Sequence, residues 1–214
     1  MAIVTVSRQL GSGEFEFSTQ LAERLGYRLI DRQLLERAAE ELDVPIQAIE
    51  AIDEQPSPPL EVRIARRILS GATERVPLLW EEIAKPELSA GAVRSFLPVV
   101  IHELAAQDNL LFVGRGAGFV LAERPDVCRF HLIAPIADRV LRVRRLFNVE
   151  AAEARRVIDR TDRARGRFIR ETFGADWSNP LNYDVVFNTG VLGIAAAVEA
   201  AAAAVHRRIR MLAA

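Results

Sequence analysis

The segment from Ser7 to Glu16 combines a glycine turn with the start of a helix, and this combination can bind an anion. It reads SRQLGSGEFE, with two glycines flanking a serine. Glycine lets the backbone approach a ligand closely, and the unpaired N–H groups at a helix start carry partial positive charge. The segment therefore predicts a phosphate-binding loop. Its predicted binding residues are Arg8, Gly11, Ser12, Gly13, Glu14 and Glu16.

This loop is a degenerate form of the Walker A motif G-x-x-x-x-G-K-[ST]. Gly13 matches the second glycine, but Arg8 stands at the first glycine, Glu14 at the lysine and Phe15 at the hydroxyl residue. A carboxylate within a few ångströms of phosphate is repulsive by about 1 kcal/mol in water, and by several times more when partly buried. In the alternative interpretation, Glu14 and Glu16 only cap the helix, where acidic side chains are favourable.

A second candidate is the region 139–170, which carries eleven arginines. Four of them recur at helical spacing and share one helix face: Arg156, Arg160, Arg163 and Arg167. Arginine donates two parallel hydrogen bonds to phosphate oxygens, and phosphoryl transfer needs cations around those oxygens. We favour a phosphate-facing row over a solvated face paired with the acidic residues of the same region.

The elements that must position these residues alternate between strand and helix. Apolar runs predict strands over 2–7, 27–30, 109–113, 127–133 and 183–188. Helices are predicted over 14–25, 31–42, 60–72, 96–107, 136–147 and 150–170, with an alanine-rich helix at the end. This alternation predicts an α/β fold with a parallel sheet covered on both faces. Ligands of such sheets bind at the carboxyl ends of the strands, where both glycine turns fall.

Composition narrows the function classes. The chain has 214 residues, is 50% hydrophobic and 27% charged, and carries a net charge of −1. These values suit one compact domain and argue against a nucleic-acid-binding surface. The single cysteine, Cys128, excludes a disulfide within the chain. The longest apolar stretch, 191–205, is interrupted and too short to span a bilayer, so we expect a cytoplasmic location and no membrane partner.

These segments together resemble the cytidylate kinase-like family of bacterial P-loop proteins. The matching residues at the start are Ser7, Arg8, Gln9, Gly11, Ser12, Gly13, Glu16, Ala22, Leu25, Gly26 and Asp31. Further matching blocks are 113–115, 173–180, 182–184 and 188–189, whereas 50–95 matches poorly. The resemblance implies a single domain with a three-layer P-loop NTPase or nucleoside monophosphate kinase-like fold. It divides the chain into a core (1–42 and 96–214), a helical acceptor region (about 43–95) and an arginine-rich helical lid (about 139–170).

The resemblance also implies a reaction and its residues. The reaction is phosphate transfer from ATP, with Mg²⁺, to a nucleoside monophosphate-like acceptor. The implied acceptor-binding residues are Asp31, Arg37 and Arg115. The implied catalytic residues are the lid arginines Arg139, Arg142, Arg160, Arg163 and Arg167. The partner is thus a nucleotide or another phosphorylated small molecule.

Several departures from the family pattern leave alternatives open. Gly116 and Gly118 stand where family members carry a carboxylate, so the magnesium ligands are left unassigned. Glu16 or Asp31 holding magnesium through water is an open alternative to helix capping by Glu14 and Glu16. Ala164 replaces an aspartate that helps recognise cytidine, so cytosine specificity is not carried over. The leading alternative is a catalytically impaired pseudokinase that binds nucleotide or phosphate as a regulatory module. A weaker one is a structural protein whose alanine-rich helix (195–204) forms a homodimer seam.

Overall fold

A computed structural model describes residues 2–31 and 90–213, which form a parallel sheet with helices on both faces. The five strands lie in the order β2-β3-β1-β4-β5, and every neighbouring pair is parallel. Their bounds are β1 (Ile3–Arg8), β2 (Arg28–Ile30), β3 (Leu110–Val113), β4 (Val127–Ile133) and β5 (Val185–Asn188). The α/β prediction is confirmed, and each predicted strand is present with its ends shifted by at most two residues.

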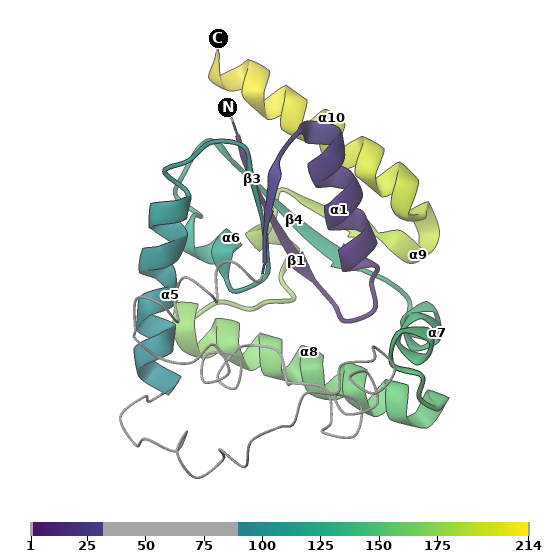
Figure 1. The fold of residues 1–214 in the computed structure, drawn as a ribbon. Helices are drawn as coiled ribbons and strands as arrows, with labels where there is room; N and C mark the ends of the chain where they lie inside the picture. Colours follow the sequence, from purple (N-terminus) through teal and green to yellow (C-terminus); the bar gives the residue numbers. More distant parts are fainter. Residues whose placement is uncertain (1, 32–89, 214) are drawn as a thin grey trace, which may run out of the picture.

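The helices fall into two layers and one crossing helix (Figure 1). Their bounds are α1 (Glu14–Leu25), α5 (Ala90–Leu104), α6 (Ala117–Val120), α7 (Ile136–Phe147), α8 (Ala151–Phe173), α9 (Thr189–Leu192) and α10 (Ile194–Leu212). Helix α5 begins six residues before its predicted start and continues through Pro98. The predicted helix over 31–42, apart from Asp31, and the predicted helix over 60–72 lie outside the described residues. So do most of the predicted acceptor region (about 43–95) and the predicted acceptor-binding residue Arg37.

Strand β1 is the centre of the sheet, and its side chains alternate between two apolar cores. Ile3 packs with residues of α5 and α6 on one face. Val4 and Val6 pack with α1 and α10 on the other face, where Phe17 and Ala201 are fully buried. A strand buried on both faces must be apolar at nearly every position, which explains the continuous run at the start of the sequence.

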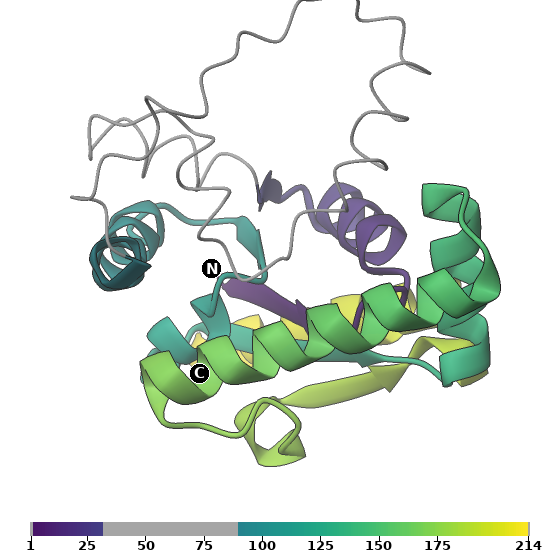
Figure 2. The ribbon, with the colours of Figure 1, turned by 90° about the horizontal axis from the view of Figure 1, so that it is seen from below.

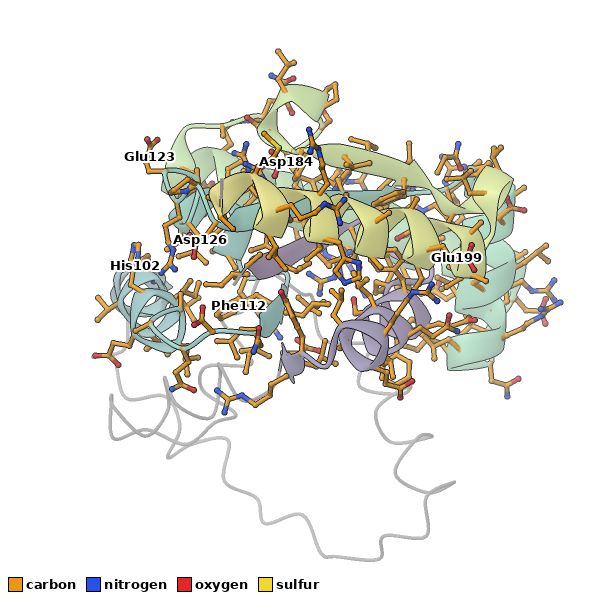
Figure 3. All side chains as sticks on the ribbon, turned by 90° about the horizontal axis from the view of Figure 1, so that it is seen from above. His102, Phe112, Glu123, Asp126, Asp184 and Glu199 are labelled. Atoms are coloured by element: carbon orange, nitrogen blue, oxygen red, sulfur yellow. The ribbon has the colours of Figure 1, made fainter. Side chains whose placement is uncertain are left out.

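Helix α8 crosses the carboxyl-end edge of the sheet, as the view from below shows (Figure 2). Together with α7 it forms a helical pair beside the loop that follows β1. The opposite edge, seen in Figure 3, carries the labelled carboxylates Asp126 and Asp184 before β4 and β5. Asp126 pairs with Arg124 at 2.6 Å, and Asp184 pairs with Arg129 at 3.3 Å. Ion pairs of the scaffold thus occupy the amino ends of these strands, and the candidate site lies at the other edge.

Candidate functional site

The loop between β1 and α1, residues 9–13, has a backbone that requires glycine at two positions. Gly11 and Gly13 have φ angles of 78° and 86°, in the left-handed region that side chains disfavour. A Cβ atom on Gly11 would lie 2.9 Å from the carbonyl oxygen of Arg139. One on Gly13 would lie 2.4 Å from the Cδ1 atom of Ile194. Both glycines are therefore required by the backbone angle and by close neighbours.

The carbonyl groups of this loop are held by side chains from α7 and α9. Arg139 Nε donates to the Leu10 carbonyl at 2.8 Å, and Arg142 Nη1 donates to the Gly11 carbonyl at 3.2 Å. Thr189 Oγ1 donates to the Ser12 carbonyl at 2.6 Å. In a trans peptide the C=O and N–H groups point in opposite directions. Holding the Leu10 and Ser12 carbonyls therefore turns the amides of Gly11 and Gly13 the opposite way, whereas the Ser12 amide donates to the Gln9 carbonyl at 3.2 Å.

The amides of Gly11, Gly13 and the first turn of α1 are the candidate donors to an anion. Helix α1 makes its first i to i−4 hydrogen bond from Phe17 to the Gly13 carbonyl at 3.0 Å, so the amides of residues 14–16 precede the helical pattern. Within residues 2–31 and 90–213, no acceptor is bonded to the amides of Gly11 and Gly13. Consecutive amides of this kind, in a left-handed turn at a helix start, bind anions.

The predicted loop residues differ in exposure. Ser12 is fully buried, and its hydroxyl donates to the Gln9 carbonyl at 2.8 Å. Arg8 is buried at the end of β1. Glu14 is half-buried and Glu16 is exposed, and in the described part of the chain the Glu14 carboxylate accepts no hydrogen bond from the loop. If the Glu14 carboxylate bound the loop amides, it would block phosphate from them. The structure shows no such contact among the described residues.

A different carboxylate contacts the loop. Asp162 of α8 accepts a hydrogen bond from the Leu10 amide at 3.0 Å and also pairs with Arg139. The Leu10 side chain packs among apolar residues of both helices, including Val143 and Ile158. The predicted catalytic residue Arg139 is consequently buried within an ion pair that joins α7, α8 and the loop.

The predicted arginine row lies on the exposed face of α8. Its four members, Arg156, Arg160, Arg163 and Arg167, are all exposed. The arginine of this helix that contacts the loop region is Arg165, which is 2% exposed and donates to the Arg8 carbonyl at 2.9 Å. Its position could have been recognised from the apolar residues Ile158, Phe168 and Ile169, whose helical spacing places residue 165 on the buried face. The catalytic role assigned to Arg160, Arg163 and Arg167 stays a prediction.

Part of that row, and its neighbours, pair with the acidic residues of the same region. Arg156 pairs with Glu153 at 3.1 Å, and Arg155 pairs with Asp159 at 2.9 Å. Exposed pairs of this kind contribute little to stability, commonly below about 1 kcal/mol. They leave the arginines available to a ligand that brings a stronger negative charge.

Two of the three predicted acceptor residues, Asp31 and Arg115, meet at the ends of β2 and β3. Arg115 is 6% exposed, and its Nη2 atom lies 3.6 Å from Asp31 Oδ1. Arg115 has a φ angle of 57°, and its two glycine neighbours also have positive φ angles. A non-glycine residue in this region is strained, and such strain is concentrated at functional sites. A Cβ atom on Gly116 would lie 2.6 Å from Phe173, so packing against α8 excludes a carboxylate there.

The described residues lack the usual hydroxyl ligand of magnesium in the β1–α1 loop. Phe15, at the position of the usual hydroxyl ligand, is an apolar side chain that is 80% exposed. In the part of the chain that the structure describes, no group of three His, Cys, Asp or Glu side chains is arranged to hold a metal ion.

A polar and aromatic cluster supports the end of β1. Trp177 Nε1 donates to Ser7 Oγ at 2.9 Å, and the Tyr183 hydroxyl donates to the Trp177 carbonyl at 2.7 Å. His131 stacks on Tyr183 with ring centroids 4.5 Å apart. Burial, and then the charge of Arg165, lowers the pKa of His131 from 6.5 to about 4, so its imidazole is neutral at neutral pH. The sequence did not predict that these residues form a cluster, although Trp177 and Tyr183 lie in the blocks that match the family.

A small cavity of about 20 Å³ lies beside this cluster, lined by residues that include Ser7, Arg165 and Trp177. Its volume suits a single water molecule. It is too small for a nucleotide, so the exposed amides of the β1–α1 loop remain the better candidate for the ligand site.

The fold and the site define a class: a P-loop protein of the α/β, nucleoside monophosphate kinase-like type. The chain belongs to the cytidylate kinase-like family, whose model matches residues 3–191. Among curated proteins it is similar to a cytidylate kinase from Ignicoccus hospitalis, with 24% identity over 200 residues, covering 93% of this chain and 96% of that protein.

Solved structures share the fold at low sequence identity. An uncharacterised protein from Eubacterium ventriosum superposes with a TM-score of 0.67 and 16% identity, covering 96% of this chain and 99% of that one. A gluconokinase from Sinorhizobium meliloti superposes with a TM-score of 0.50 and 14% identity, covering 99% of this chain and 95% of that one. No described helix is long and apolar enough to cross a membrane.

Proposed function

We propose that this protein is a nucleotide kinase that transfers a phosphoryl group from ATP to a nucleoside monophosphate-like acceptor. The observation that carries the proposal is the β1–α1 loop, whose carbonyls are held by side chains of α7 and α9, while the amides of Gly11 and Gly13 bond no acceptor among the described residues. Membership of the cytidylate kinase-like family supports the same reaction. Phosphoryl transfer requires positioning and positive potential more than covalent chemistry, and backbone amides supply both.

We assign the donor phosphates and the acceptor phosphate to the carboxyl ends of two neighbouring strands. The donor phosphates bind the amides of the β1–α1 loop, next to Gly11 and Gly13. The acceptor phosphate binds Arg115, whose guanidinium lies 3.6 Å from the Asp31 carboxylate and is held in a strained turn after β3. Strands β1 and β3 are hydrogen-bonded neighbours, so the two phosphates meet at one edge of the sheet. We assign Mg²⁺ to the nucleotide phosphates and derive no protein-bound step from it.

The test is an ADP-release assay with ATP, Mg²⁺ and a panel of nucleoside monophosphates. We expect turnover with at least one acceptor, and we expect Arg115→Gln to raise the KM for that acceptor by about tenfold or more, since a charge-assisted hydrogen bond is lost. Arg210→Gln is the matched control, because this exposed arginine lies at the far end of α10. The absence of ADP release with every acceptor would reject the kinase.

A pseudokinase is the second candidate, and a specific observation favours it. Glu14 is the first residue of α1 at the position of the usual lysine, and the exposed Phe15 follows it. Under this proposal the loop binds nucleotide or phosphate as a regulatory module without turnover. Calorimetry with ATP, ADP, CMP and inorganic phosphate separates the two: tight binding without ADP release supports the pseudokinase, and turnover rejects it.

A further inference from the structure

One carboxylate and one guanidinium hold the same residue of the β1–α1 loop from two sides. The Leu10 amide donates to Asp162 Oδ1 of α8 at 3.0 Å, and the Leu10 carbonyl accepts from Arg139 Nε of α7 at 2.8 Å. Asp162 and Arg139 also form an ion pair with each other. Asp162 therefore holds the amide of Leu10 directly and its carbonyl through Arg139.

Leu10 belongs to two peptide groups, so these contacts fix both of them. The C=O and N–H groups of a trans peptide point in opposite directions. The Leu10 carbonyl therefore sets the direction of the Gly11 amide, which is a candidate donor to an anion. The Leu10 amide likewise sets the direction of the Gln9 carbonyl, which accepts from the Ser12 amide at 3.2 Å and from the Ser12 hydroxyl at 2.8 Å. The shape of the turn around Gly11 is thus held at Leu10.

Burial makes this ion pair an effective anchor. The side chains of Arg139 and Asp162 are 6% and 19% exposed, so water and salt screen the pair less than they screen an exposed pair. The side chain of Leu10 packs against Val143 and Ile158, which keeps the loop in contact with both helices. Because Arg139 neutralises its charge, Asp162 repels a nearby phosphate less than an unpaired carboxylate would.

We propose that Asp162 is a positioning residue for donor binding: it fixes Leu10, directly and through Arg139, so that the Gly11 amide is directed at the donor phosphate. Asp162 itself does not contact the ligand. This inference rests on the proposed function, because it assumes that donor phosphates bind the amides of Gly11 and Gly13. It gives α8 a second role, on its buried face, beside the role predicted for the arginine row on its exposed face.

The first test is calorimetry with inorganic pyrophosphate, a probe that occupies the donor loop without an acceptor. Asp162→Asn keeps an oxygen for the Leu10 amide but removes the charge that holds Arg139. We expect this variant to raise the Kd for pyrophosphate by about tenfold or more, because the Gly11 amide is no longer held in the binding orientation. In the ADP-release assay the KM for ATP should rise by a similar factor, while the KM for the acceptor stays within about threefold of the natural value.

Ile169→Ala is the matched control for loss of stability. Ile169 lies on the buried face of α8 and packs with Trp177 and Tyr183, in a different apolar cluster from Leu10. Its truncation leaves a cavity and should lower the melting temperature, but it removes no hydrogen bond of the loop. With both variants measured well below their melting temperatures, the pyrophosphate Kd should rise only in Asp162→Asn. Equal rises in the two variants would overturn the inference, because the effect would then be one of general destabilisation.

Hydrogen exchange of the natural protein provides a test that does not depend on the folding of any variant. If Asp162 links α8 to the loop, binding of pyrophosphate should slow amide exchange both in the loop (residues 9–13) and in the part of α8 around Asp162, because linkage between two sites is reciprocal. Slower exchange in the loop alone would overturn the inference and leave the proposed function intact. An unchanged pyrophosphate Kd in folded Asp162→Asn would do the same. If the natural protein binds neither ATP nor pyrophosphate, the proposed function fails, and this inference fails with it.

Discussion

Lowering the pH from about 7.5 to about 5 should destabilise the folded protein through His131. Burial, followed by the charge of Arg165, lowers the pKa of His131 from 6.5 to about 4. Between these two values the unfolded chain binds a proton at His131 and the folded chain does not, so the free energy of unfolding falls as the pH falls. The contribution of neutral His131 to the free energy of unfolding is complete above about pH 6.5 and is lost progressively toward pH 4.

The magnitude follows from one-proton linkage. With the unfolded pKa at 6.5 and the folded value at about 4, the loss between pH 7.5 and 5 is about 2 kcal/mol. The assay is urea unfolding at both pH values, followed by tryptophan fluorescence and circular dichroism. His131→Phe is the comparison, because it keeps a flat ring against Tyr183 but cannot bind a proton.

The quantity to compare is the change in the free energy of unfolding between the two pH values, measured separately for each protein. Other groups also lose stability in acid: a hydrogen bond from Arg124 lowers the pKa of Asp126, so part of the pH dependence remains in any variant. His131→Phe should show a pH effect smaller by about 2 kcal/mol than that of the natural protein. Equal pH effects in the two proteins would refute the assignment of a buried, neutral His131.

Three further predictions concern the loop. Gly13→Ala should lower the free energy of unfolding by more than Gly26→Ala. In both variants alanine would adopt a left-handed backbone at a cost of about 1–2 kcal/mol, but only at position 13 would its Cβ atom also meet a neighbouring side chain. Urea unfolding of both variants measures the difference. Asp162→Asn should destabilise the fold by about 3 kcal/mol, since it leaves the buried Arg139 without its carboxylate, and a melting temperature unchanged from the natural protein would contradict this. Glu14→Lys should lower the Kd for ATP in calorimetry by removing a like charge, and a neutral result would mean that phosphate does not bind at this loop.

The order of strands and helices was predictable because it depends on local patterns. Apolar, β-branched runs separated by glycine turns indicate buried parallel strands, and the described part of the chain has five of them. The loop at Gly11 and Gly13 was also predictable, since residues with positive φ angles after a strand are marked by glycine. The family-like blocks added Arg115, which the structure places beside Asp31.

The partners of the arginines could not be predicted from spacing. A helical repeat shows which arginines share a face of α8, but it does not show whether that face meets the loop or the solvent. Packing decided this: the apolar side of α8 lies against the end of β1, so Arg165 is buried and Arg163 is exposed. The same packing brought Asp162 to the amide of Leu10.

By itself, the sequence determined a parallel α/β fold and a glycine loop suited to phosphate, because both depend on backbone angles and burial patterns along the chain. Only the tertiary structure decided which charges act on that loop. Arg142 and Thr189 lie 131 and 177 positions from the loop residues that they bind. Such contacts depend on how whole helices pack against the sheet. The spacing of charged residues along the sequence does not predict this packing.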